Sequence, residues 1–85
     1  MKTEQEIQKE ISKNFESKGY WVLKIMKSNK NGCPDLLCVK KDHTFFVEVK
    51  KRNGIISELQ KFRIKELRKV GVEAYAMDGI NSIIF

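Results

Sequence analysis

The sequence has no long hydrophobic run, a single histidine and only two cysteines. No stretch approaches the roughly 20 apolar residues of a membrane-spanning helix, and the polar N-terminus is unlike a signal peptide. We therefore expect a cytoplasmic, intracellular protein with no membrane partner. His43, Cys33 and Cys38 lack the spacing of a zinc site. We expect both thiols to be reduced, with Cys38 packed as a small apolar side chain.

Internal repeats, low-complexity tracts and linkers are also missing, which favours one domain over residues 1–85. Charged residues make up 33% of the chain and hydrophobic residues 41%, a composition typical of globular proteins. Lysine and arginine exceed aspartate and glutamate by six, as 17 against 11. This excess favours a polyanionic partner, because neutralising phosphates releases counterions, although a generic basic domain carries a similar charge.

Two segments have the pattern of amphipathic helices. Residues 3–18 begin with a capping box and repeat apolar side chains every three or four positions, and Gly19 follows. Residues 57 to about 70 begin with a second capping box and are followed by Gly71.

Runs of β-branched and aromatic residues predict the strands. We expect four, at residues 20–26, 35–40, 44–51 and 72–77. Residues 41–43 form the predicted hairpin turn, and the apolar residues 80–85 are left without a predicted type. A helix that crosses between the third and fourth strands makes that pair parallel, with a right-handed connection.

Two acidic residues stand in segments that otherwise have the pattern of buried strands. Asp35 opens one strand, and Glu48 lies inside the next, two positions before Lys50. Because side chains alternate along a strand, Glu48 and Lys50 share one face. Two carboxylates and a lysine on adjacent strands suit a divalent metal, a polarised phosphate and an activated water. Asp35 as a strand-entry residue, and Glu48 with Lys50 as an exposed ion pair, are the structural alternatives.

This pattern resembles the PD-(D/E)XK nuclease superfamily, with Pro34-Asp35 as the first half of the motif and Glu48-Val49-Lys50 as the second. The longer string Gly-Cys-Pro-Asp-Leu at 32–36, Val-Glu-Val-Lys at 47–50 and Ser-Glu-Leu-Gln at 57–60 is similar to the VRR-NUC domain, which includes stand-alone viral and bacterial nucleases. The resemblance covers nearly the whole chain. It implies an α/β fold with a restriction-endonuclease-like core in the order α-β-β-β-α-β, a mixed sheet flanked by helices.

The resemblance also implies a Mg²⁺ or Mn²⁺ site and a catalytic lysine. The implied metal ligands are Glu4, Asp35, Glu48 and the backbone carbonyl of Val49. Lys50 would orient or deprotonate the attacking water. Glu4 shares the apolar stripe of its helix, with Glu6 in reserve, because Glu6 already has a capping role. A first-turn acid that stabilises the helix dipole is the alternative for Glu4.

Gln60 has two interpretations. It completes a capping box with Ser57, which alone explains the residue. The resemblance places a glutamine near the catalytic site, where it would bond the water or a phosphate. Gln60 shares a helix face with Ile64 and Leu67, so it can point toward the sheet.

Basic residues near the predicted site are candidates for binding substrate phosphates, although lysines on loops are more often simply solvated. These candidates are Lys24, Lys27, Lys30, Lys51 and Arg52.

The resemblance implies a metal-dependent, structure-selective DNA endonuclease. Its substrate would be branched DNA, such as four-way (Holliday) junctions, cut by a homodimer. No element resembles a recognition helix for the major groove. A flap or nicking nuclease and a non-catalytic basic nucleic-acid-binding module are the alternatives, and a small protein-interaction domain is a third. The apolar segment 80–85 is a candidate for the dimer contact.

Overall fold

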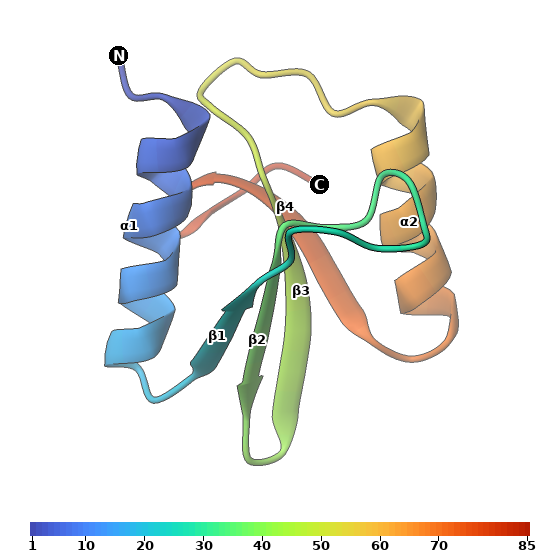
Figure 1. The fold of residues 1–85 in the computed structure, drawn as a ribbon, viewed down its shortest axis with the longest axis horizontal. Coiled ribbons are helices and arrows are strands. Elements are labelled where there is room, and N and C mark those ends of the chain that lie inside the picture. The colour runs from blue at the N-terminus through green and yellow to red at the C-terminus, as the bar shows by residue number, and fades with distance from the viewer.

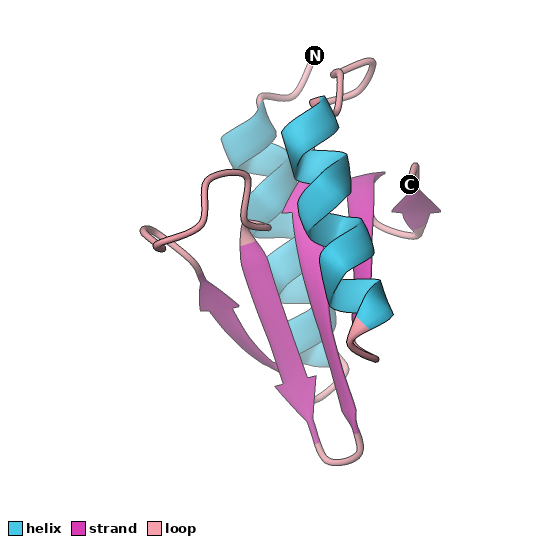
Figure 2. Ribbon diagram, turned by 90° about the vertical axis from the view of Figure 1, so that its right-hand side faces the viewer, coloured by secondary structure: helices cyan, strands magenta, loops and turns pink.

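A five-stranded mixed sheet forms the centre of the structure, with one helix on each face (Figures 1 and 2). The computed structural model describes residues 1–85. In chain order the elements are α1 (Glu4–Ser17), β1 (Trp21–Lys24), β2 (Leu36–Lys40), β3 (His43–Val49), α2 (Glu58–Lys69), β4 (Glu73–Gly79) and β5 (Ser82–Ile83). The strands lie side by side in chain order, and only β3 and β4 are parallel. The predicted order α-β-β-β-α-β is confirmed, with β5 added at its end.

Both helices begin with the capping boxes that the sequence predicts. The backbone N–H of Glu6 donates to the Thr3 hydroxyl at 3.1 Å, and the Glu6 carboxylate accepts from the Thr3 N–H at 2.9 Å. Ser57 starts α2 in the same way. Gly19 and Gly71 follow the helices at φ of +91° and +93°, the left-handed region in which helices commonly end. Neither helix combines the length and the apolar character that crossing a bilayer requires.

The two faces of β3 separate two apolar clusters. The larger cluster fills the space between α1 and the sheet and contains Ile7, Ile11, Leu36, Cys38, Phe45, Val47, Val49 and Met77. The smaller cluster lies under α2 and contains Ile64, Ala74 and Ala76, with Phe46 and Phe85 packed against it. Cys38 is a free, buried thiol, as the sequence predicts, and burial raises its pKa to about 11. Glu48 is the only charged residue that is buried.

The hairpin turn between β2 and β3 is one residue shorter than predicted. It contains only Lys41 and Asp42, and His43 is the first residue of β3, paired with Lys40. Asp42 takes the left-handed conformation at φ +64°, which aspartate tolerates better than most residues. The tighter turn sets the register of the whole β2–β3 pair.

Other strand ends differ from the prediction by one or two residues. β1 is shorter than residues 20–26, because its regular pairing with β2 ends at Lys24. β3 ends at Val49 rather than at residue 51, although the Lys50 N–H still donates to the Met77 carbonyl at 2.9 Å. Residues 80–85, which had no predicted type, contain a turn and the short strand β5.

The long loop between β1 and β2 is held against α2 at two points. Gly32 has φ +79°, and a Cβ atom at this position would lie 2.8 Å from Leu59 Cγ. The Arg63 Nε donates to the Asn31 carbonyl at 2.8 Å. These contacts position the segment that leads into Asp35.

We expect Gly32→Ala to destabilise the protein more than Gly19→Ala. Both replacements place alanine at positive φ, which costs about 1–2 kcal/mol. Only Gly32→Ala also forces its new methyl group against Leu59, since a Cβ atom added to Gly19 would meet nothing within 4 Å, and this overpacking adds about 1–3 kcal/mol. Urea unfolding measures both losses. Equal losses would show that the loop moves away from α2 at no cost.

Candidate active site

The register of β2 and β3 brings Asp35 and Glu48 together. The pairing aligns Leu36 with Val47, so one further step places Asp35 across from Glu48. Residues directly opposite each other on neighbouring strands point to the same face of a sheet. That face is the one under α2, because Phe46, two positions before Glu48, packs against the α2 cluster. The two carboxyl groups interact directly.

Asp35 is fixed by its backbone and by its side chain. Its carbonyl accepts from the Ile25 N–H at 2.8 Å, which extends the β1–β2 pairing by one step. Its Oδ2 accepts from the Val49 N–H at 2.8 Å. Asp35 lies one residue before β2 rather than inside the strand, which corrects the predicted boundary. The carboxylate therefore takes the place of a backbone acceptor at the end of the β2–β3 ladder.

Glu48 is the electrostatic centre of this region. Its exposed fraction is 2%. Burial, followed by the charge of Asp35 and a contact with the Asp35 carboxyl group, raises the pKa of Glu48 to about 8. The charge of Lys50 opposes this rise, and the charge of Glu4 adds to it. The surroundings of Glu48 therefore disfavour its ionised form, and a nearby positive charge would stabilise that form.

Lys50 lies on the Glu48 side, as strand alternation predicts. Its Nζ is 4.0 Å from Glu48 Oε2, and its side chain is mostly buried. The residue follows the last residue of β3, but its backbone still pairs with β4 through Met77. The backbone therefore fixes the base of the lysine side chain, and its ammonium group lies beside the carboxylates.

Gln60 forms two side-chain hydrogen bonds, one within the capping box and one to the buried carboxylate. Its Oε1 accepts from the Ser57 N–H at 3.0 Å, which closes the capping box of α2. Its Nε2 donates to Glu48 Oε2 at 3.1 Å. The cap that begins α2 therefore also joins α2 to the buried carboxylate.

The first turn of α1 contains two acidic residues, Glu4 and Glu6. Glu4 is exposed in the first turn of α1, and its charge acts on Glu48. No group of three or more histidine, cysteine, aspartate and glutamate side chains is arranged to bind a metal ion. Glu6 is turned back onto the Thr3 N–H, which lowers the pKa of Glu6. This hydrogen bond leaves Glu4 as the candidate from α1.

The Asp35–Glu48 pair has the chemistry of a divalent cation site. Two carboxylates in contact repel one another, and the burial of one strengthens that repulsion. A Mg²⁺ or Mn²⁺ ion would offset both charges, and Mg²⁺ commonly binds through one or two carboxylates, waters and substrate phosphate. The side chain of Val49, the fourth predicted ligand, is buried on the α1 side, so only its backbone can take part.

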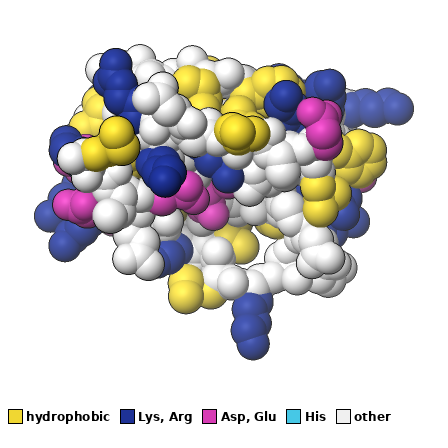
Figure 3. All heavy atoms as spheres, turned by 90° about the horizontal axis from the view of Figure 1, so that it is seen from above, with side chains coloured by type: hydrophobic (Ala, Val, Ile, Leu, Met, Phe, Trp, Pro, Cys, Tyr) yellow, Lys and Arg dark blue, Asp and Glu magenta, His cyan; other side chains and the backbone are white.

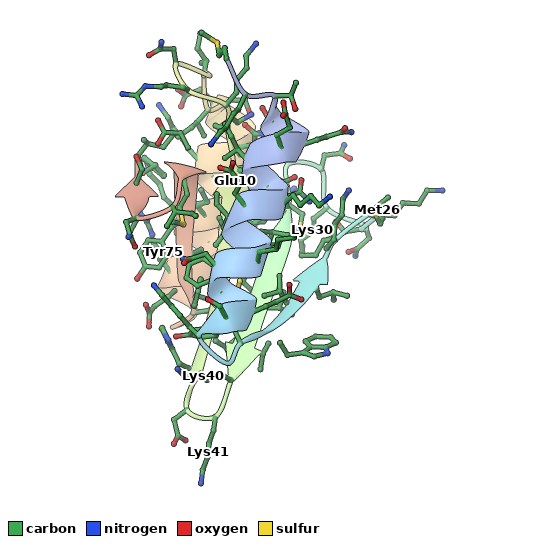
Figure 4. The ribbon with its side chains drawn as sticks, turned by 90° about the vertical axis from the view of Figure 1, so that its left-hand side faces the viewer. Glu10, Met26, Lys30, Lys40, Lys41 and Tyr75 are labelled. Carbon is green, nitrogen blue, oxygen red and sulfur yellow. The ribbon has the colours of Figure 1, made fainter.

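The predicted phosphate-binding residues are exposed and lie on segments that meet at the site end of the molecule. Figure 3 views this end and shows acidic side chains near the middle of the surface, with basic side chains beside and around them. None of these candidates forms a salt bridge within the protein. They are Lys24 at the end of β1, Lys27 and Lys30 in the following loop, and Lys51 and Arg52 after β3. By contrast, Lys40 and Lys41 lie at the hairpin, at the opposite end (Figure 4).

Sequence reasoning missed two features of this region. The Val49 N–H, rather than any side chain, holds Asp35. Leu59 and Arg63 hold the loop that precedes Asp35. The bond from the Val49 N–H could have been predicted from a two-residue hairpin turn, because such a turn places Asp35 opposite Glu48. Nothing in the sequence pattern marks the second feature.

Comparisons with known proteins agree with this geometry. The profile of the VRR-NUC domain family matches residues 2–81, which include both halves of the acidic motif. A solved structure described as a VRR-NUC domain superposes with a TM-score of 0.81 and 28% sequence identity. The match covers 94% of this chain and 89% of that one. No curated protein matches the chain.

We expect the metal-free protein to lose stability between pH 5 and pH 8 because of Glu48. Its pKa is about 8 in the folded state and 4.5 ordinarily. Between these values the folded state holds more protons than the unfolded chain, so the free energy of unfolding falls as pH rises. The slope is at most about 1.4 kcal/mol per pH unit.

Glu48→Gln should remove this slope, because glutamine cannot ionise and can still accept from Gln60. Urea unfolding in EDTA at several pH values measures it. Glu16→Gln is the control, since Glu16 is exposed and forms no salt bridge. Parallel pH profiles for wild type and Glu48→Gln would contradict the raised pKa.

Proposed function

This chain belongs to the VRR-NUC domain family, and we propose that it is a metal-dependent DNA endonuclease. The observation that carries the proposal is the contact of the partly buried Asp35 carboxylate with the buried Glu48, with the Lys50 ammonium 4.0 Å from Glu48. These three residues and Gln60 are the proposed catalytic group. Family membership supports a nuclease-type hydrolase that acts on DNA, and the details of substrate and metal are our inference.

Asp35 and Glu48 would hold a Mg²⁺ or Mn²⁺ ion, with the Val49 carbonyl and Glu4 as further oxygen donors, directly or through water. A bound ion of this kind polarises a phosphoryl oxygen and lowers the pKa of its coordinated water. The protein keeps Asp35 in place with the Val49 N–H and Glu48 with the Gln60 amide, at 2.8 and 3.1 Å.

Lys50 would orient the attacking water and offset negative charge on the phosphoryl group. Its side chain is largely excluded from solvent, and a charge in a water-poor site acts more strongly than one in bulk water. A lysine can do this positioning work while it stays protonated. Gln60 is a positioning residue, because it acts on the reaction through Glu48.

Branched DNA, such as a four-way junction, is the proposed substrate. The chain has an excess of six positive charges, and exposed lysines near the site suit contacts with phosphates, which position DNA without reading its sequence. Each helix packs one face on the sheet, and neither carries the side-chain pattern of a recognition helix for the major groove. We therefore propose that the protein selects its substrate by the shape of the DNA. A flap or nicking nuclease would use the same site.

We propose a homodimer, because two sites related by a two-fold axis suit the two strands that are cut in a junction. The segment 80–85 supports this assignment only in part. Phe85 packs on its own subunit, against the cluster under α2. Ile80, Ile83 and Ile84 are exposed beside the edge strand β5, and these three side chains are the proposed contact.

Cleavage of a labelled four-way junction and a matched linear duplex, with Mg²⁺, Mn²⁺ or EDTA, tests the function. We expect metal-dependent cutting of the junction, reduced at least about 100-fold in Asp35→Asn and Lys50→Ala, with binding retained in gel shifts. Lys41→Ala, at the far hairpin, is the control that should cut normally. Binding without cutting under either metal would favour the non-catalytic module, and equal cutting of the duplex would reject junction selectivity.

Gln60→Ala and Ser57→Ala separate the positioning role of Gln60 from its capping role. Both changes break the capping box and should cost about 0.5–2 kcal/mol of stability. Only Gln60→Ala removes the hydrogen bond to Glu48. We therefore expect kcat to fall about tenfold in Gln60→Ala with KM little changed, and to stay near wild type in Ser57→Ala. Equal kcat values in the two variants would show that Gln60 acts only as part of the capping box.

A further inference from the structure

The sheet is not fully covered on the α2 side. α2 lies across β3 and β4 and leaves β1 open on this face (Figure 2). A groove of about 730 Å³ lies between α2 and the loop that leads to Asp35. Its apolar lining comes from Cys33, Pro34, Phe46, Phe62, Leu67 and Val70.

The rim of this groove is strongly basic. Lys30, Lys65, Lys69 and Arg63 line it, with Glu66 as the only acid. Arg63 pairs with Glu66 at 2.9 Å. None of the three lysines forms a salt bridge in the protein. The rim therefore presents uncompensated positive charge around an apolar floor.

Phe62 gives the groove an aromatic surface. The residue is 53% exposed, so part of its ring is accessible from solvent. The Arg63 guanidinium lies 5.4 Å from the centre of the Phe62 ring. An exposed aromatic face flanked by cations is the combination with which proteins bind unpaired nucleotides, because bases stack on the ring and phosphates contact the cations.

The groove and the candidate active site share two segments of the chain, although the carboxylates and Lys50 do not line the groove. Cys33 and Pro34 immediately precede Asp35 in the loop, and Phe46 precedes Glu48 by two positions on the same face of β3. A DNA strand with a phosphate at the carboxylate pair would have its neighbouring nucleotides close to this groove.

We propose that the groove binds an unpaired nucleotide of the substrate strand, with its base against Phe62 and its phosphates against Lys30 and Lys69. The proposal rests on the nuclease function and gives that site a means of choosing its substrate. Bases in a continuous duplex are stacked inside the helix and cannot reach an aromatic side chain without unstacking. Branch points and flaps supply unpaired bases at little cost.

Charge favours nucleic acid over a second copy of this chain as the occupant. A symmetric contact through the groove would bring two lysine rims together, in a protein that already carries a net charge of +6. A polyanion neutralises the same lysines and releases its counterions.

Fluorescence anisotropy in EDTA, where no cleavage occurs, tests the groove directly. The probes are a linear duplex, the same duplex with a short single-stranded flap, and that flap made of abasic nucleotides. We expect wild type to prefer the flap with bases. Phe62→Ala should weaken binding of that probe about tenfold, with the other two unchanged, and Phe62→Trp should restore it.

Charge variants test the rim. Lys30→Gln with Lys69→Gln should make binding of the base-containing flap less dependent on salt, by about two units of logarithmic slope. Lys9→Gln with Lys13→Gln, on the exposed side of α1, removes the same charge away from the groove and should change the slope less. Equal changes in both pairs would reject a local role for the rim.

Three results would overturn the proposal. Wild type could bind abasic and base-containing flaps equally, or Phe62→Ala could bind every probe like wild type. A lower molar mass of Phe62→Ala in light scattering, with flap binding unchanged, would assign the groove to a second copy. Cleavage with no effect of Phe62→Ala on binding rejects the groove and keeps the nuclease. Base-dependent binding by a protein that never cleaves supports the groove and rejects the nuclease.

Discussion

The contact between the Asp35 and Glu48 carboxyl groups is the constraint on which the site depends. Two like charges, one of them buried, are unfavourable together, so each must be held by a separate partner. The Val49 N–H holds Asp35, and the Gln60 amide holds Glu48. Lys50 supplies a positive charge at 4.0 Å. No buried side-chain nitrogen or oxygen is left without a partner, so the strain that remains is electrostatic, and a bound cation would relieve it.

One face of β3 contributes to the hydrophobic core, and the other carries the candidate site. Alternate side chains pack with α1 in the larger cluster, which needs no contribution from the candidate site. The intervening side chains face α2, where Phe46 lies beside the groove and Glu48 meets Gln60. Because α2 covers only part of this face, the protein keeps an open surface next to its carboxylates. A domain of 85 residues can thus hold a core and a site on the two sides of one strand.

The sequence could predict most of the fold and the composition of the candidate site. Capping boxes and apolar periodicity located both helices to within a residue or two, because these signals are local. Alternation in β3 placed Glu48 and Lys50 together for the same reason. The predicted three-residue turn was wrong, and its error is instructive. Pairing Lys40 with residue 44 would set Glu48 opposite Leu36 and turn Asp35 to the other face, since a slip of one residue inverts a strand.

The sequence by itself therefore determined both helices, the first four strands, their order and the candidate site residues, since each follows from interactions between near neighbours in the chain. Only the tertiary structure decided the register that joins Asp35 to Glu48, the second bond of Gln60 and the groove beside Phe62. Each of these depends on the packing of segments that are distant in sequence. No local sequence pattern indicates how much of the sheet α2 covers. The groove exists because α2 covers only part of this face.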